Sequence, residues 1–471
     1  MGSGASTIEI PLPSEEKTIN ASSIPFPKKG VKLSYVQDFY NLCGGRDIIE
    51  DLTTTEINDN FQKKITEKYK LSFCDYLSYQ NHPAVGEATV FISHAWKYRF
   101  VDVMDALQFH FKDNPDVIIW FDLFSNNQHI TLDLDFNWWC GAFKSAIEMF
   151  GHTVMVFCPW NDPIPLKRTW CIWELYCTFV TKQKFEIALS HENQKQFLND
   201  VLKAPTGEIN KMLTLIDAEK SECFKPEDRS KIFEIVKKEV GFNNINSMIF
   251  EKMRDWVVTT TKSFMSIEKD DKKIIEIMST LGTLYCDQGK YDLTEPLFVD
   301  CFKKRKELLG DDHPDTLTSM NNLAILYDNQ GKNDLARPLY LDCLSKRKEI
   351  LGDNHSDTLA SMNNVANLYC DLGSYNLAEP LYLDCLSKRK ELSGDNHPDT
   401  LASMNNLAKL YCAHWKYNLA EPLYVDCLKK RKELLGDDNP DTFDSMNNLA
   451  DLYEKQGKYE YAESIRVPVK S

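Results

Sequence analysis

The stretch that decides the C-terminal fold is MNNLAILY at residues 320–327. Nearly the same string returns three times at intervals of 42 residues, and a weaker repeat begins at Asp271. A repeat of this length is a helix pair that cannot bury its own apolar face, so neighbouring repeats must stack. The sequence therefore predicts an all-helical solenoid of five repeats over residues 271–471, with the last repeat truncated.

Small residues recur in each repeat where two helices must approach closely, as Ala324 and Ala336 do in one of them. One cysteine per repeat falls in a shared register: Cys301, Cys343, Cys385 and Cys427. We interpret these four as small buried packing residues. The chain has 14 cysteines and no Cys-x-x-Cys pair, which indicates reduced thiols in a cytoplasmic protein rather than disulfides or metal ligands.

Residues 85–206 alternate apolar runs with helical patterns, which is typical of an α/β domain with a parallel sheet. The predicted strands are residues 89–93, 117–122, 153–158 and 185–189. The predicted helices are residues 100–112, 139–150, 169–178 and 193–202. Around this domain we predict a disordered leader over residues 1–28, a helical preamble over residues 29–84 and a helical connector over residues 207–270.

Two polar clusters stand directly against apolar runs of this domain. Asp122 ends the second predicted strand, and Asn127 and Gln128 follow it. Glu174 follows two tryptophans on an apolar helix, where a carboxylate is costly to bury unless a partner or a ligand uses it. Open α/β sheets bind ligands at the carboxyl ends of their strands, so these residues predict a site there. His94 follows the first predicted strand and is expected near the same cleft.

The repeat string resembles the tetratricopeptide repeat (TPR) of kinesin light chains. The resemblance also rests on Gly-Lys, Ala-Glu-Pro-Leu-Tyr, Lys-Arg-Lys-Glu and Leu-Gly-Asp farther along the repeats. It covers residues 271–471 and implies a solenoid that binds a peptide or protein partner. Kinesin light chains also carry a long heptad segment, and no sustained heptad pattern precedes the repeats here. The resemblance therefore does not by itself imply microtubule transport.

One asparagine per repeat falls at the position that faces the concave groove in TPRs: Asn322, Asn364, Asn406 and Asn448. The resemblance implies that these amides hold the backbone of a bound peptide. A ladder of solvated amides with no ligand is the alternative.

Residues 88–190 resemble the Toll/interleukin-1 receptor (TIR) domain. Val-Phe-Ile-Ser at residues 90–93 is similar to its first strand, and Trp-Phe-Asp at residues 120–122 is similar to its second strand. Trp-Cys-Ile-Trp-Glu-Leu at residues 170–175 is similar to a motif of plant TIR domains. The Trp-x-Asp and Arg-x-Trp-x-x-x-Glu strings also resemble the fungal heterokaryon-incompatibility domain.

TIR domains have a flavodoxin-like fold; many cleave NAD+ with a glutamate on the third helix, and others only self-associate. The matching position is Glu174, so the resemblance implies that Glu174 is catalytic, with NAD+ as substrate and no cofactor. The substrate-binding residues that it implies are Ser93, His94, Asp122, Asn127, Gln128 and Trp170. Two alternatives stay open: Glu174 pairs with Arg168 or Lys144, or the other side chains serve hydrogen bonding, capping and packing within the fold.

The charge and the N-terminus narrow the class of partner. A net charge of −15 argues against non-specific binding to nucleic acid. The sequence shows no apolar stretch long enough for a transmembrane helix and no secretory signal. The first six residues, MGSGAS, fit the pattern for N-myristoylation at Gly2, and a plain Gly/Ser leader fits it too.

These observations together predict a cytoplasmic signalling or defence protein. Its solenoid binds a peptide or protein partner, and its TIR-like domain self-associates and hydrolyses NAD+. Two other functions fit the same sequence: a non-enzymatic scaffold, and a cargo adaptor of the kinesin-light-chain type.

Overall fold

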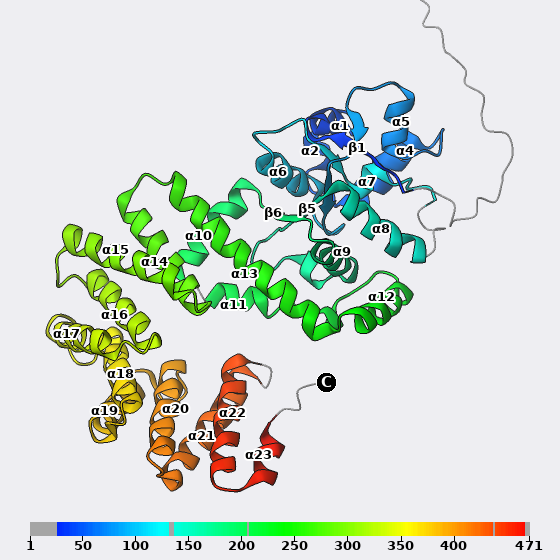
Figure 1. Ribbon diagram of the computed structural model, residues 1–471. Coiled ribbons are helices and arrows are strands. Elements are labelled where there is room, and N and C mark those ends of the chain that lie inside the picture. The colour runs from blue at the N-terminus through cyan, green and yellow to red at the C-terminus, as the bar shows by residue number, and fades with distance from the viewer. Residues whose placement is uncertain (1–25, 131–135, 205–206, 437–438, 467–471) are drawn as a thin grey trace, which may run out of the picture. The chain divides into compact units, whose positions relative to one another are not determined.

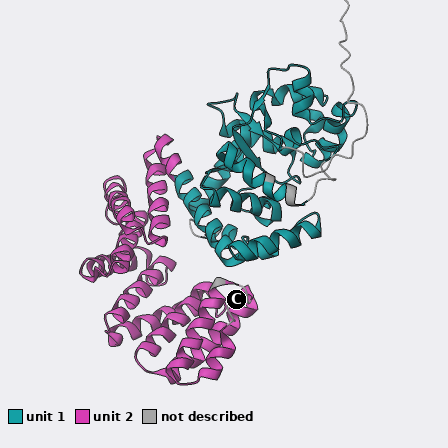
Figure 2. Ribbon diagram, turned by 45° about the vertical axis from the view of Figure 1, so that its right-hand side comes forward, with its two compact units in different colours: residues 1–261 teal, residues 262–471 magenta. Residues whose placement is uncertain are grey.

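The computed structural model describes residues 26–130, 136–204, 207–436 and 439–466. Most of the leader that the sequence predicts, including Gly2, lies outside the described residues. The chain divides into two compact units, Met1–Thr261 (unit 1) and Lys262–Ser471 (unit 2) (Figure 2). Within the described ranges, no helix combines the length and the apolar character needed to cross a membrane.

Unit 1 is an α/β domain built on one six-stranded sheet. The strands are β1 Lys29–Lys32, β2 Val85–Glu87, β3 Val90–Ser93, β4 Ile118–Trp120, β5 His152–Val156 and β6 Lys184–Ala188. Their order in the sheet is β2-β1-β4-β3-β5-β6. The last four strands pair in parallel at the positions that the sequence predicts, so the α/β fold is confirmed. β3 and β4 are almost entirely apolar, as expected where helices cover both faces of a sheet, whereas β5 and β6 begin with polar residues.

The sheet is mixed because β1 and β2 join it in antiparallel pairing. β1 pairs with β2 on one side and with β4 on the other. Gly30 allows the close approach to β4, since a Cβ atom there would lie 2.2 Å from the carbonyl oxygen of Ile119. The segment predicted as a helical preamble thus also supplies a strand. Its single well-buried apolar residue, Val31, is too weak a pattern to reveal that strand in the sequence.

Two pairs of helices cover the two faces of the sheet (Figure 1). They are α6 Phe100–His110 and α10 His191–Lys203 on one face, and α8 Phe136–Phe150 and α9 Thr169–Val180 on the other. Side chains alternate along β3 accordingly: Phe91 lies edge-on to Phe143 of α8, whereas Ile92 joins the core that contains α6. This is the doubly wound arrangement, in which ligands bind beyond the carboxyl ends of the strands.

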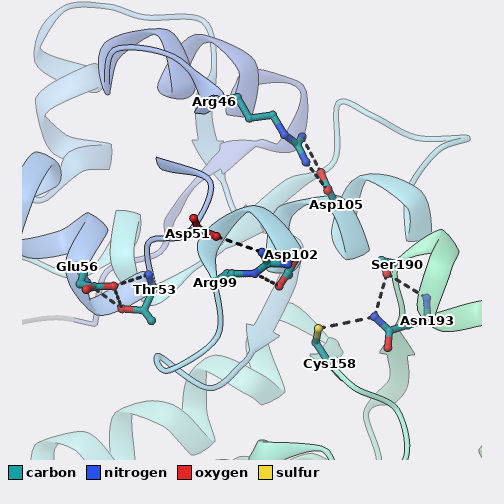
Figure 3. Close-up of polar contacts among 10 residues, drawn as sticks. All are labelled: Arg46, Asp51, Thr53, Glu56, Arg99, Asp102, Asp105, Cys158, Ser190 and Asn193. Carbon is teal, nitrogen blue, oxygen red and sulfur yellow. Dashed lines mark hydrogen bonds and ion pairs between the residues drawn. The ribbon is translucent and has the colours of Figure 1, made fainter. Parts of the chain in front are cut away.

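Short helices before β2 pack on the face that carries α6. They are η2 Leu33–Tyr35, α1 Val36–Leu42, α2 Arg46–Ile49, α3 Thr54–Ile57, η3 Asn58–Gln62, α4 Lys63–Thr66 and α5 Phe73–Tyr79. Two arginines tie this layer to α6 (Figure 3). Arg46 forms a two-pronged ion pair with Asp105, and Arg99 contacts both Asp51 and Asp102.

The other elements of unit 1 lie between the strands or after the last strand. They are α7 Asp122–Ser125, η5 Ile164–Lys167, α11 Gly207–Leu213, η6 Ala218–Lys220, α12 Pro226–Glu239 and α13 Phe242–Ile267. The helix α12 packs against α8 and α9, and α13 runs past the end of unit 1. The helical connector that the sequence predicts therefore contributes to the packing of unit 1 itself.

Unit 2 is a stack of antiparallel helix pairs. The first helices of the pairs are α14 Asp271–Asp287, α16 Pro314–Asn329, α18 Ser356–Asp371, α20 Pro398–Ala413 and α22 Pro440–Lys455. The second helices are α15 Tyr291–Leu309, α17 Asn333–Leu351, α19 Tyr375–Ser393, α21 Tyr417–Leu435 and α23 Tyr459–Ile465. Every second helix packs on its own first helix, and each except α23 also packs on the first helix of the next repeat. The predicted all-helical solenoid is confirmed.

The same polar clasp joins successive repeats. The Cys343 thiol is fully buried and donates to the carbonyl oxygen of Leu317 at 3.3 Å. One helical turn later, Arg347 donates to the carbonyl oxygen of Asp357 at 3.0 Å and to the Ser361 hydroxyl at 2.9 Å, both in the following repeat. Equivalent arginine contacts occur at Arg305, Arg389 and Arg431. The recurring cysteines are thus packing residues, as the sequence indicates.

We expect residues 262–471 to fold without unit 1, because each repeat packs on its sequence neighbours. The isolated fragment should give a strongly helical circular dichroism spectrum and a cooperative thermal transition. A spectrum dominated by coil or strand would contradict this expectation.

Candidate functional site

Four of the residues predicted for the site meet beyond the carboxyl ends of β3 and β4. Ser93 ends β3 and His94 follows it, whereas Asp122 is the first residue of α7, just after β4. Glu174 reaches this place from α9 on the other face of the sheet. The strand ends bring together side chains that lie far apart in the sequence, as expected for an open α/β sheet.

Glu174 is a buried carboxyl group without a cationic partner. Glu174 is only 9% exposed, and the Ser93 hydroxyl donates to its Oε2 at 2.5 Å. Neither Arg168 nor Lys144 forms an ion pair with it among the described contacts, so the pairing that the sequence left open is absent. Burial raises the pKa of Glu174 to about 8; the Ser93 hydrogen bond opposes this shift and the nearby Asp122 charge adds to it.

Asp122 is the second carboxyl group of the site. The indole N–H of Trp96 donates to Oδ2, and the backbone N–H of Leu123 donates to Oδ1 at 2.8 Å. Burial raises the pKa of Asp122 to about 7, although both hydrogen bonds act in the opposite direction. Two carboxyl groups with raised pKa values in one place are typical of a functional site.

His94 contributes an unpaired ring nitrogen. Its ring stacks on Phe121 with the centroids 4.4 Å apart, and its Nδ1 lies 3.8 Å from Oδ1 of Asp122. Burial lowers the pKa of His94 to about 3, so the imidazole is neutral and its contact with Asp122 is not an ion pair. Its Nε2 is buried and has no hydrogen-bond partner in the described part of the chain.

Three other predicted site residues use their side chains inside the fold. Asn127 donates to the carbonyl oxygen of Lys70 at 2.7 Å, and Gln128 donates to that of Asp122 at 2.7 Å. Trp170 packs against two phenylalanine rings of α8. The amides thus hold the loop after α7, and the structure does not bring them together with Glu174.

Two further residues, Trp96 and Cys171, contact the site. Trp96 fixes the Asp122 carboxyl group, and the signal for it is its place just after β3. The Cys171 thiol donates to the carbonyl oxygen of His94 at 3.6 Å, and burial raises its pKa well above the ordinary value. A thiol in that environment is inert as a nucleophile.

The structure shows no comparable chemistry elsewhere in the ranges that it describes. No group of three or more histidine, cysteine, aspartate or glutamate side chains is placed there to hold a metal ion. A groove of about 580 Å³ lies between α6 and the start of α10. Its carboxylates Asp102 and Asp105 are ion-paired with Arg99 and Arg46, so they are already neutralised (Figure 3).

The second candidate site runs along the first helices of unit 2. These helices contact one another from repeat to repeat, so they form one layer of the stack. Asn364 donates to Oδ1 of Asn321 in the preceding repeat at 3.0 Å. The same contact joins Asn406 to Asn363 at 3.4 Å and Asn448 to Asn405 at 3.2 Å. An amide has two N–H donors and an accepting oxygen, so this ladder uses only part of its capacity.

A family model of the tetratricopeptide repeat matches residues 273–349, 328–391 and 357–433. The repeats are tetratricopeptide repeats. The matched residues all lie in unit 2, where the TPR helices have just been described. A search of curated proteins finds no match to the chain.

Several solved TPR structures are similar to part of the chain. The kinesin light chain repeats of Podosopora anserina are 23% identical, cover 40% of this chain and 89% of their own, and give a TM-score of 0.35. BtubC (BKLC) from P. vanneervenii is 24% identical over 45% of this chain and 85% of its own, with a TM-score of 0.38. The quorum sensor NprR from B. thuringiensis is 15% identical over 58% and 72%, with a TM-score of 0.37. At these identities and TM-scores, the similarities do not indicate what this chain binds.

Proposed function

We propose that the TPR solenoid binds an extended peptide or a protein segment along its layer of first helices. The observation that carries this proposal is the asparagine ladder, which repeats in one register over successive repeats. An extended peptide presents alternating N–H and C=O groups. The asparagine amides on the layer have unused donors and acceptors that can pair with both.

Replacing both Asn364 and Asn406 by alanine should weaken peptide binding by about 1 kcal/mol for each hydrogen bond lost. Folding should change little, since both side chains are partly exposed. The measurement is the affinity for a peptide selected against the wild-type protein from a random display library. Asn376 and Asn418, which are exposed on the second helices of the same repeats, give the matched double-alanine control. Unchanged affinity of the Asn364/Asn406 variant would contradict the proposal.

We also infer that unit 1 cleaves the bond between nicotinamide and ribose in NAD+. The observation that favours this second function is a pair of carboxyl groups with raised pKa values at the carboxyl ends of β3 and β4: Glu174, which is buried, and Asp122, whose side chain is partly exposed. Breaking this bond builds positive charge on the ribose, and an ionised carboxylate in a dry site stabilises that charge. The bonding electrons leave with the nicotinamide nitrogen, which becomes neutral, so no acid is needed to protonate it.

The residues around Glu174 suit this role. Ser93 holds one carboxylate oxygen and so fixes the orientation of the group. The positive charge of NAD+ favours the ionised form of a carboxyl group whose pKa burial has raised. Water then adds to the ribose carbon and gives up a proton, which a carboxylate of the site can accept, because burial has raised the pKa values of both carboxyl groups toward neutral pH.

The two activities together describe a cytoplasmic signalling or defence protein. In it the TPR solenoid recruits a partner, and unit 1 self-associates and hydrolyses NAD+. Incubating the concentrated protein with NAD+ and measuring released nicotinamide tests the catalytic part. No release would favour a scaffold without enzymatic activity. Binding of a kinesin motor chain would favour a cargo adaptor.

A further inference from the structure

A buried polar stripe runs along the helices that precede α5. Thr54, Asn58, Gln62 and Thr66 follow one another at four-residue intervals through α3, η3 and α4. This spacing places them on one face, and all four are buried, with Gln62 entirely so. The stripe begins at a capping box between Thr53 and Glu56 (Figure 3).

Three side chains of this stripe carry polar atoms without a partner in the part of the chain that the structure describes. They are Oγ1 of Thr54, Oδ1 of Asn58, and both Oε1 and Nε2 of Gln62. Thr66 differs, because its hydroxyl donates to the carbonyl oxygen of Gln62 at 3.0 Å and lies 2.9 Å from Nε2 of His129. Unpaired buried polar groups are costly, and native proteins keep them where water or a ligand pairs with them.

The stripe lies beside the candidate catalytic site. The backbone N–H of Thr54 donates to the carbonyl oxygen of Tyr98 at 3.0 Å, and the Thr55 hydroxyl donates to that of Trp96 at 3.3 Å. The middle of the stripe, η3, packs against α7, whose first residue is Asp122. The element that carries both unpaired amides therefore packs beside the helix that begins at Asp122. In addition, η3 is a π-helix, a form that is frequent at functional sites.

We propose that Asn58 and Gln62 bind the carboxamide of nicotinamide. The Gln62 amide presents a donor and an acceptor side by side, and a primary carboxamide offers the complementary pair, so two hydrogen bonds form. The unpaired Oδ1 of Asn58 accepts the second N–H of the ligand. Because Gln62 is fully buried, η3 must shift to admit the ring. This inference rests on the proposed cleavage of NAD+ and names the residues that select its leaving group.

The carboxamide also distinguishes nicotinamide from nicotinic acid. Nicotinic acid carries a carboxylate, which only accepts hydrogen bonds and would face Oε1 of Gln62 without a proton between them. A site built to pair with an amide discriminates strongly against an analogue that leaves its polar groups unpaired. The full-length protein should therefore bind nicotinamide at least about tenfold more tightly than nicotinic acid.

The test is calorimetric titration of the full-length protein with nicotinamide and with nicotinic acid. Gln62→Met should weaken nicotinamide binding about tenfold or more, remove the discrimination and raise the melting temperature, because an unpaired amide is replaced by an apolar group of similar shape. Thr66→Val is the matched control. It removes a hydroxyl that already has partners, so it should lower the melting temperature and leave the nicotinamide affinity unchanged.

Equal affinity of the wild type for both ligands would overturn the proposal, and so would unchanged nicotinamide affinity in Gln62→Met. A lower melting temperature of Gln62→Met with unchanged affinity would assign the amide to bound water. Nicotinamide binding that depends on Gln62 without NAD+ cleavage would overturn the hydrolase function and leave the carboxamide site standing. NAD+ cleavage together with unchanged nicotinamide affinity in Gln62→Met would support the hydrolase function and overturn the carboxamide site.

Discussion

Glu174→Gln should lower the rate of NAD+ cleavage by about 100-fold or more, the usual effect of deleting one electrostatic stabiliser of a transition state. The substitution keeps the shape of the side chain and removes its charge. It should leave the melting temperature unchanged or raise it, because the native carboxyl group is buried without a cation. Turnover is measured as nicotinamide released by concentrated protein. Equal turnover by wild type and by folded Glu174→Gln would end the catalytic assignment.

The pH dependence gives a second readout of the same group. The pKa of Glu174 is raised to about 8 in the folded protein, against about 4.3 in an unfolded chain. The carboxyl group therefore lowers stability progressively as the pH rises from about 4 to about 8. Turnover should rise over the upper part of this range as the carboxylate forms. Glu174→Gln should lose this contribution to the pH dependence of both stability and turnover, whereas Lys97→Gln, at an exposed position, should keep both.

Arg347→Ala should lower the free energy of unfolding of the TPR fragment by about 3 kcal/mol, since about 1 kcal/mol is expected for each hydrogen bond lost. Arg347 is only 3% exposed and donates to Asp357, Ser361 and Thr318. Removing it leaves three acceptors without this donor, two of them in the following repeat. Urea unfolding of residues 262–471 measures the change.

Lys348→Ala is the matched control for the clasp. Lys348 neighbours Arg347 on the same helix, is 40% exposed in its side chain and forms only a surface ion pair with Asp353. Its removal should change the free energy of unfolding by less than about 0.5 kcal/mol. Equal effects of the two substitutions would show that the buried clasp contributes nothing beyond a surface charge.

The sequence predicts those strands in which apolar residues dominate. β3 and β4 are recognised because nearly every residue in them is apolar and both faces are covered. β1 is not recognised, since Lys29 and Lys32 flank a glycine and a single valine. Its existence depends on the backbone of β4, to which it pairs across the sheet, and no local pattern reports such a partner.

The candidate site could likewise be predicted only in part, because local patterns do not report distant partners. Ser93, His94 and Asp122 could be placed near one another because each ends or follows a strand. The sequence also places Asn127 in that group. Its actual partner is the carbonyl oxygen of Lys70, 57 residues earlier, and no local pattern indicates that contact. The sequence does not predict the buried stripe through Gln62, for a related reason. Polar residues at four-residue spacing ordinarily mark an exposed helix face, and only tertiary packing shows that this face is covered.

The antiparallel pair formed by β1 and β2 also decides which edges of the sheet are open to a further strand. Without β1, the strand β4 would present a row of open N–H and C=O groups to any molecule in solution. β1 occupies that row, so a foreign strand can extend the described sheet only beside β2 or β6. β2 is three residues long and offers little to pair with. Of the two edges of the described sheet, only β6 therefore offers a strand of ordinary length to a further chain.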